Sequence, residues 1–293
     1  MDETGAEQSV PDQLLLATDL SARSDRALDR AAQLAAEWGA ELVVLNVLDP
    51  AAAPDQALAR IGGASDEELL HAARQQLDRD TRGLPVSTTL HVARGTDPAT
   101  QIVATAAATR AGLIVTGVAR NEILGRFVLG STVENLARTL PQPLLIVRNR
   151  APTAYERIVV ATDFSEPSLR ALRAVAALFP GRELILYHAG DVVMDGLATP
   201  AQPAADFDVE QRACAAFLAD AALSDRIRVR PVIERGPVEM TLARYVREND
   251  IDLVAMGSRG RGGIMSLLLG NTAALLIDWL PCDTLLVREP QDS

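Results

Sequence analysis

The amino-acid sequence repeats itself once, and this repeat constrains the fold more than any other feature. The run Leu-Leu-Ala-Thr-Asp-Leu-Ser at 15–21 returns at 159–165 as Val-Val-Ala-Thr-Asp-Phe-Ser. Further matching pairs are Arg94-Gly95 with Arg235-Gly236, Gly117 with Gly257, Gly130 with Gly270, and the run 144–148 with the run 284–288. A repeat of about half the chain predicts two copies of one domain, at residues 1–150 and 151–293, which meet in the polar stretch 149–156.

Each copy alternates short apolar strands with helical patterns. In the first copy we expect strands at 14–18, 42–48, 86–92, 113–116 and 144–147. We expect helices at 24–38 and 131–140, a helix that begins at 65 and extends beyond 77, and a helix that begins at 97. Ser65 with Glu68 predicts a capping box, and Asp97-Pro98 predicts another helix start. In the second copy we expect strands near 158–162, 183–188, 228–234, 253–256 and 284–287. The Gly-, Pro- and Ala-rich stretches 49–64 and 190–205 are expected to be loops. Such alternation predicts an α/β fold with a parallel sheet covered on both faces.

A glycine-rich stretch at 256–272 follows the fourth expected strand of the second copy. Its spacing is Gly-x2-Gly-x9-Gly-Asn, formed by Gly257, Gly260, Gly270 and Asn271. Glycines let backbone amides approach phosphate oxygens, and a helix that starts at Asn271 adds free N–H groups and the positive end of its dipole. An isolated Gly-x2-Gly more often only turns the chain, so the flanking strand and helix carry the prediction of an anion site.

These motifs, taken with the repeat, resemble the universal stress protein family. The resemblance occurs once in each copy and so covers nearly the whole chain. The family's loop reads Gly-x2-Gly-x9-Gly-Ser/Thr, and Asn271 stands where Ser or Thr is usual. The resemblance implies two open five-stranded parallel sheets with strand order 3-2-1-4-5 and helices on both faces. It also implies bound ATP, since many members of the family hold it.

With that strand order, the ligand crevice lies between strands one and four, beyond their carboxyl ends. The resemblance then implies which residues line it. In the second copy they are Ala161, Thr162, Asp163, Ala189, Met256, Gly257, Gly260, Gly270, Asn271 and Thr272. In the first copy they are Ala17, Thr18, Asp19, Val47, Gly117, Gly130, Ser131 and Thr132.

The two copies depart from the family pattern in different ways. Arg120 replaces the second glycine of the loop in the first copy, where its side chain could crowd a phosphate or pair with it. The second copy keeps all three glycines beside Arg259 and Arg261, and Asn271 can still cap a helix and form hydrogen bonds. The second copy is therefore the better expected phosphate site.

Several of these residues also have a purely structural explanation. Ser131 with Glu134 reads as a capping box, and Asp19 and Asp163 could cap the helix that follows them. His188, at the end of an expected strand, is explained by packing or hydrogen bonding rather than catalysis.

Composition and motifs exclude several functions. A net charge of −11 disfavours nucleic acid as a partner. Cys214 and Cys282 lie in apolar surroundings and are expected to be buried thiols, which fits a reducing cytoplasm. The three histidines show no zinc spacing with them.

The acidic N-terminus is not a signal peptide, and no apolar run has the length of a membrane span. No P-loop or nucleophile elbow is present.

The function expected on these grounds is that of a cytoplasmic stress-response protein that binds ATP or a related adenine nucleotide, with Mg²⁺ held by a carboxylate through water. One alternative is a non-catalytic interaction module with degenerate sites or an apolar ligand, and another is a weak ATPase. The fifth strand of each copy, an apolar sheet edge, needs a cover. In the family it pairs antiparallel with its twin, so we expect a pseudo-dimer within one chain, and two chains could associate further as a homodimer.

Overall fold

The computed structural model describes residues 10–288 except for 22–23, 49–64, 119–120, 124–125, 129, 151–152, 191–201 and 259–270. The chain divides between Ala154 and Tyr155 into two compact units, called the first and second copy below. Each unit has the doubly wound α/β fold that the sequence predicts.

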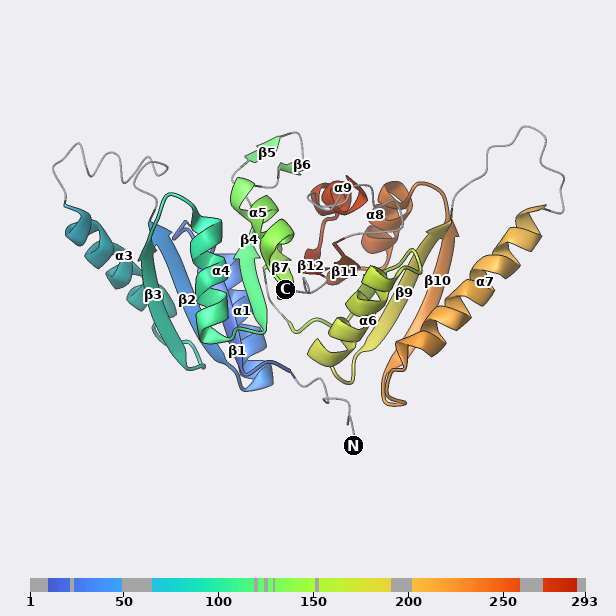
Figure 1. Ribbon diagram of the computed structural model, residues 1–293, viewed down its shortest axis with the longest axis horizontal. Helices are drawn as coiled ribbons and strands as arrows, with labels where there is room; N and C mark the ends of the chain where they lie inside the picture. Colours follow the sequence, from blue (N-terminus) through green and yellow to red (C-terminus); the bar gives the residue numbers. More distant parts are fainter. Residues whose placement is uncertain are drawn as a thin grey trace. The chain divides into compact units, whose positions relative to one another are not determined.

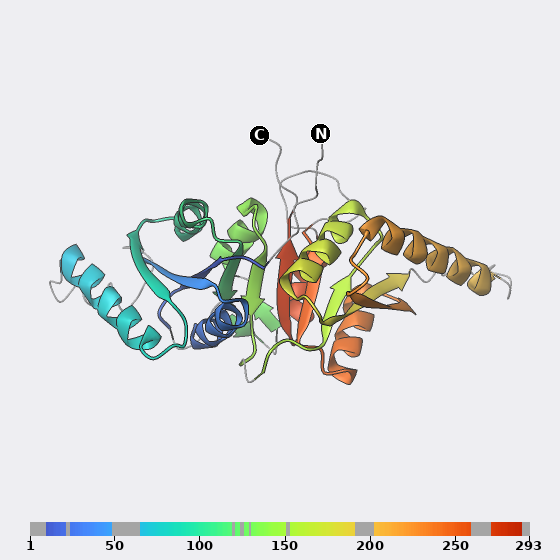
Figure 2. The ribbon, with the colours of Figure 1, turned by 90° about the horizontal axis from the view of Figure 1, so that it is seen from below.

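In the first copy, five parallel strands lie side by side in the order β3-β2-β1-β4-β7. The strands are β1 (Gln13–Thr18), β2 (Glu41–Leu48), β3 (Thr88–Arg94), β4 (Leu113–Gly117) and β7 (Leu144–Val147). The helices are α1 (Asp25–Trp38), α3 (Asp66–Thr81), α4 (Pro98–Thr109) and α5 (Ser131–Thr139). α1 and α3 cover one face of the sheet, and α4 and α5 cover the other (Figure 2). The strand order 3-2-1-4-5 implied by the family resemblance is therefore confirmed.

The second copy repeats this arrangement with the strand order β10-β9-β8-β11-β12 (Figure 1). Its strands are β8 (Ile158–Ala161), β9 (Glu183–Gly190), β10 (Arg228–Arg235), β11 (Leu253–Gly257) and β12 (Asp283–Val287). Its helices are α6 (Glu166–Leu178), α7 (Gln202–Ala221), α8 (Val238–Glu248) and α9 (Asn271–Trp279). α6 packs beside α7, and α8 packs beside α9.

Local sequence explains where the helices of the first copy begin and end. Ser65 accepts the amide of Glu68 at 3.3 Å, and the Glu68 carboxylate accepts the Ser65 amide at 2.7 Å, so the predicted capping box is confirmed. Asp97 caps α4 by accepting the Ala99 amide, with Pro98 in the first turn. Gly39 ends α1 with a φ of 66°, which glycine adopts without strain.

Two segments differ from the sequence-based prediction. Within the expected loop between Gly117 and Gly130, the chain forms a short antiparallel hairpin, β5 (Asn121–Ile123) with β6 (Arg126–Val128). In the second copy, the expected loop 190–205 is shorter, because Gly190 ends β9 and α7 already begins at Gln202. Pro203 does not prevent this helix start, since amides of the first helical turn have no partner within the helix.

The apolar strands explain the core of each unit. Leu14, Leu15 and Leu16 are fully buried, as are Val159 and Val160 in the second copy, because helices cover both faces of each sheet. In the part of the chain that the structure describes, no helix combines the length and hydropathy needed to span a membrane.

Candidate functional site

The predicted site of the first copy comes from several elements that end or begin at one edge of the sheet. Ala17 and Thr18 end β1, Val47 is the penultimate residue of β2, and Gly117 ends β4. β1 lies between β2 and β4, so these carboxyl ends are neighbours. Asp19 directly follows β1. Gly130, Ser131 and Thr132 form the start of α5, the helix that follows β4 and its hairpin.

The corresponding residues of the second copy are only partly described. Ala161 ends β8 and is followed by Thr162 and Asp163, Ala189 is penultimate in β9, and Met256 and Gly257 end β11. Thr272 lies in the first turn of α9, which Asn271 begins. Gly260, Gly270, Arg259 and Arg261 lie outside the described residues, as does Arg120 in the first copy.

The turn after strand one has the same hydrogen bonds in both copies. The Thr18 hydroxyl accepts the Leu20 amide at 3.0 Å, and the Thr162 hydroxyl accepts the Phe164 amide at 2.9 Å. Asp19 Oδ1 accepts the Ser21 amide at 3.0 Å, and Asp163 Oδ1 accepts the Ser165 amide at 3.1 Å. The two aspartates therefore have a structural role, which is to hold the turn that precedes α1 or α6.

Gly257 is required by packing. A Cβ atom at this position would lie 2.8 Å from the backbone of Pro167, in the first turn of α6. Any side chain would push α6 away from the end of β11, so the close approach of helix and strand explains this glycine without a ligand.

The start of α5 differs from its predicted form. Gly130 is the N-cap residue and makes no side-chain cap, while Ser131 is the first helical residue. The predicted Ser131–Glu134 capping box is therefore wrong, because Ser131 lies one position too late to cap. Glu134 lies 3.8 Å from Arg138 instead. The exposed Ser131 hydroxyl and the amides of the first helical turn lie at the side of the sheet where the parallel strands have their carboxyl ends. There, the amides of the first turn and the helix dipole favour an anion.

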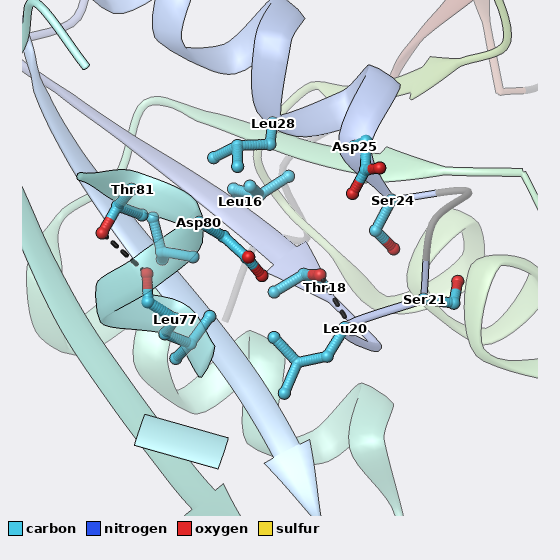
Figure 3. A pocket seen from close by; sticks show the side chains of 11 residues that line it. Leu16, Thr18, Leu20, Ser21, Ser24, Asp25, Leu28, Leu77, Asp80 and Thr81 are labelled. Atoms are coloured by element: carbon cyan, nitrogen blue, oxygen red, sulfur yellow. Dashed lines mark hydrogen bonds between the residues drawn. The ribbon is translucent and has the colours of Figure 1, made fainter. Parts of the chain in front are cut away.

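A small cavity lies next to the strand-one turn of the first copy, on the face covered by α1 and α3 (Figure 3). Thr18 is the single predicted site residue that it includes. The other lining residues are Leu16, Leu20, Ser21, Ser24, Asp25, Leu28, Val44, Leu77, Asp80 and Thr81. The Thr81 hydroxyl donates to the Leu77 carbonyl at 2.7 Å. The cavity is thus a gap between two helices and the sheet, on the face opposite α5.

Sequence reasoning missed a buried tyrosine on β9 of the second copy. The Tyr187 hydroxyl donates to Glu234 at 3.1 Å, and Arg244 pairs with the same carboxylate at 2.6 Å. Burial, together with the charge of Glu234, raises the pKa of Tyr187 to about 12. Because α8 supplies Arg244, this network joins α8 to β9 and β10.

Sequence reasoning also missed a polar residue at the end of strand two in the first copy. Asn46 donates to the Thr18 carbonyl at 2.9 Å, as His188 does to the Thr162 carbonyl at 2.8 Å in the second copy. The recurrence of a polar side chain at this place in an otherwise apolar strand was the signal that could have found it. His188 is used in hydrogen bonding, as the sequence predicts.

Within the described part of the chain, no three His, Cys, Asp or Glu side chains gather as they would around a metal ion. Cys214 and Cys282 are buried thiols, as predicted.

Fold and site together define a tandem protein of the doubly wound α/β class. Residues 12–148 and residues 154–288 each match the universal stress protein family. The chain belongs to this family.

Relatives agree with this assignment, and solved structures share the fold. A universal stress protein of Mycolicibacterium smegmatis is 26% identical over 297 residues, which cover 94% of this chain and 96% of the relative. A Thermus aquaticus universal stress protein is 33% identical over 138 residues, 46% of this chain and 99% of that protein. The fold resembles that of a functionally unknown Pseudomonas aeruginosa protein, with a TM-score of 0.70 and 21% identity over 97% of this chain and 95% of the other. A universal stress protein of Archaeoglobus fulgidus gives a TM-score of 0.63 with 22% identity over 94% and 98% of the two chains.

Proposed function

We propose that this tandem universal stress protein binds an adenine nucleotide, ATP with Mg²⁺, as a signal of cell state rather than as a fuel. The observation that supports the proposal most is the start of α5. Its first-turn amides have no side-chain cap, its N-cap is glycine, and Ser131 is exposed. This helix start and the Thr18-Asp19 turn follow neighbouring parallel strands at one sheet edge, which is where ligands bind in such folds.

The types of residue at the carboxyl ends of these strands are suited to binding a nucleotide. The N–H groups at the start of α5 and the Ser131 hydroxyl would donate to phosphate oxygens, and Val47 and Ala17 would pack against the base. Asp19 would hold Mg²⁺ through water, so most of the ligands of the ion would come from the phosphates and solvent. Bound Mg²⁺ would neutralise phosphate charge, which an acidic protein with a net charge of −11 needs.

We propose the same ligand for the second copy, and expect it to bind more tightly there because its loop keeps all three glycines. Gly270→Ala should abolish retention of nucleotide at this copy, and Ser131→Ala should weaken binding at the first copy alone.

The test has two stages. Protein purified without added ATP is denatured and the supernatant is assayed for adenine nucleotide, and calorimetry with ATP and Mg²⁺ then counts the sites. Released nucleotide, or heat of binding that Ser131→Ala and Gly270→Ala each reduce, supports the proposal. No nucleotide and no heat with either ATP or other adenosine compounds would leave an interaction module as the better description.

We further propose, from the apolar fifth strand of each copy and from the family resemblance, that the two copies pair through these strands. Residues 1–154 and 155–293, produced separately, should then combine in a one-to-one complex when mixed. Solution mass, compared with 31.2 kDa for one chain, shows whether intact chains also associate. Failure of the two halves to combine would contradict the pairing.

We place the protein in the cytoplasm, since a reducing compartment keeps thiols such as Cys214 and Cys282 reduced. Fractionation of cells with an antibody against the chain tests this location.

A further inference from the structure

The turn after strand one is strained in both copies at the same residue. Leu20 has a φ of 60° and Phe164 a φ of 59°, and neither is glycine. A left-handed backbone brings Cβ close to the following carbonyl oxygen, so a residue with a side chain adopts it only where neighbouring contacts hold it. The Thr and Asp side chains of the turn supply some of these contacts.

Another contact comes from strand two, and different amino acids supply it in the two copies. Asn46 is paired in register with Thr18 and donates from Nδ2 to the Thr18 carbonyl at 2.9 Å. His188 follows Tyr187, which is paired with Ala161, and its Nδ1 lies 2.8 Å from the Thr162 carbonyl. Because a carbonyl oxygen only accepts, Nδ1 of His188 carries the proton.

Both bonds are partly buried, which limits the access of water to them. Asn46 is 3% exposed and Thr162 is 8% exposed, whereas Thr18 and His188 are half-buried. In the second copy the ring of Phe164 also stacks on His188, with centroids 4.2 Å apart, and packs against Phe217 at 5.7 Å. A partly buried carbonyl that loses its donor is left without a protein partner and only partly hydrated, so the turn would open more often without the donor from strand two.

We propose that Asn46 and His188 are positioning residues. Each holds the carbonyl of the strand-one threonine and thereby fixes the turn that carries the Thr-Asp pair of the nucleotide site. The link to ligand binding rests on the proposed function, whereas the effect on the turn does not.

Two substitutions at one position test the proposal in the full chain. His188→Leu keeps a side chain of similar bulk but removes the donor, and His188→Asn restores the donor that the first copy uses. Hydrogen exchange followed by NMR reports on the amides of Phe164 and Ser165, which the turn protects. We expect roughly tenfold faster exchange of these amides in His188→Leu and near-normal exchange in His188→Asn.

An amide outside the turn separates positioning from general loosening. The Thr162 amide donates to the Tyr187 carbonyl in the sheet and should keep its exchange rate in both variants. Equal acceleration of Thr162, Phe164 and Ser165, unchanged exchange in His188→Leu, or failure of His188→Asn to restore the rate would each overturn the proposal.

Calorimetry with ATP and Mg²⁺ adds the second readout. Affinity at the second copy should fall roughly tenfold in His188→Leu and recover in His188→Asn. Loss of affinity without recovery in His188→Asn would overturn the role in ligand binding. If the unsubstituted chain binds no ATP, the proposed function fails, and the exchange rates alone decide whether His188 holds the turn.

Discussion

At the scale of single residues, Gly257 illustrates how packing can require a glycine that a sequence pattern assigns to ligand binding. The sequence pattern predicts this glycine as part of a phosphate loop, whereas the structure shows the backbone of Pro167 where a Cβ atom would need space. The glycine spacing could therefore be recognised from sequence, but the reason for this glycine could not, because it depends on the approach of α6.

Gly257→Ala should destabilise the protein by about 1–3 kcal/mol, since the added methyl group meets rigid backbone. Urea unfolding followed by circular dichroism measures the change. Gly95→Ala is the control, because its Cβ would lie 3.1 Å from Cγ of Gln101, a flexible side chain that can move. Equal losses in the two variants would argue against the packing explanation.

A second prediction for a single residue concerns the reactivity of Cys214. Its side chain is buried, and burial raises the pKa of its thiol, so little thiolate is available to react at neutral pH. A thiol reagent such as iodoacetamide should modify Cys214 slowly in folded protein and quickly in urea, as mass spectrometry of the peptides will show. Rapid modification without denaturant would contradict the buried position.

At the scale of elements, the helices α3 and α5 begin in contrasting ways. Ser65 caps α3 through a capping box, whereas Gly130 precedes α5 and Ser131 caps nothing. Both helix starts contain Ser followed three residues later by Glu, so sequence alone predicts a capping box at both. The serine is the N-cap residue of α3 but the first helical residue of α5, and the Ser-x-x-Glu pattern does not distinguish these two positions.

Ser65→Ala and Ser131→Ala form a matched pair. Ser65→Ala should lower the free energy of unfolding by about 1 kcal/mol, because it leaves the Glu68 amide without its partner. Ser131→Ala should change stability little and lower affinity for ATP. Urea unfolding and calorimetry of both variants separate the two effects, and a loss of stability as large in Ser131→Ala as in Ser65→Ala would contradict the observed cap.

The contact of β9 with α8 predicts how stability changes at high pH. The pKa of Tyr187 rises from 10.0 to about 12 in the folded protein, so the unfolded chain releases this proton first. The stabilisation due to neutral Tyr187 is complete below pH 10 and is lost as the pH rises towards 12. Tyr187→Phe should therefore show a shallower fall of unfolding free energy over this range, measured with urea at each pH. Equal slopes for the two proteins would refute the assignment.

The main elements could be predicted from sequence because apolar runs and helix caps are local signals. Strands such as β2 and β11 stand out as short apolar segments, and Asp97-Pro98 marks the start of α4. The hairpin β5–β6 could not be predicted because its strands have only three residues each, too few to show an alternating pattern. The early start of α7 could not be predicted because it lies in Ala- and Pro-rich sequence that is typical of a loop.

At the scale of the whole molecule, duplication made the fold and the recurrence of the turn after strand one predictable from sequence. Two runs with the same Thr-Asp pair have the same hydrogen bonds after β1 and after β8. The hydrogen bond from strand two to the threonine carbonyl was not predicted, because Asn46 and His188 are different amino acids. Their equivalence follows from the sheet register and not from residue type.

This equivalence has a consequence for engineering. Since an amide and an imidazole satisfy one carbonyl at nearly the same distance, the backbone does not need to adapt when one replaces the other. A chimera that exchanges β2 with β9, together with the facing residues of α4 and α8, should fold like its parents, as circular dichroism and urea unfolding would show. Side chains at the carboxyl ends of the strands could then be exchanged between the two copies, so that each candidate site is altered separately.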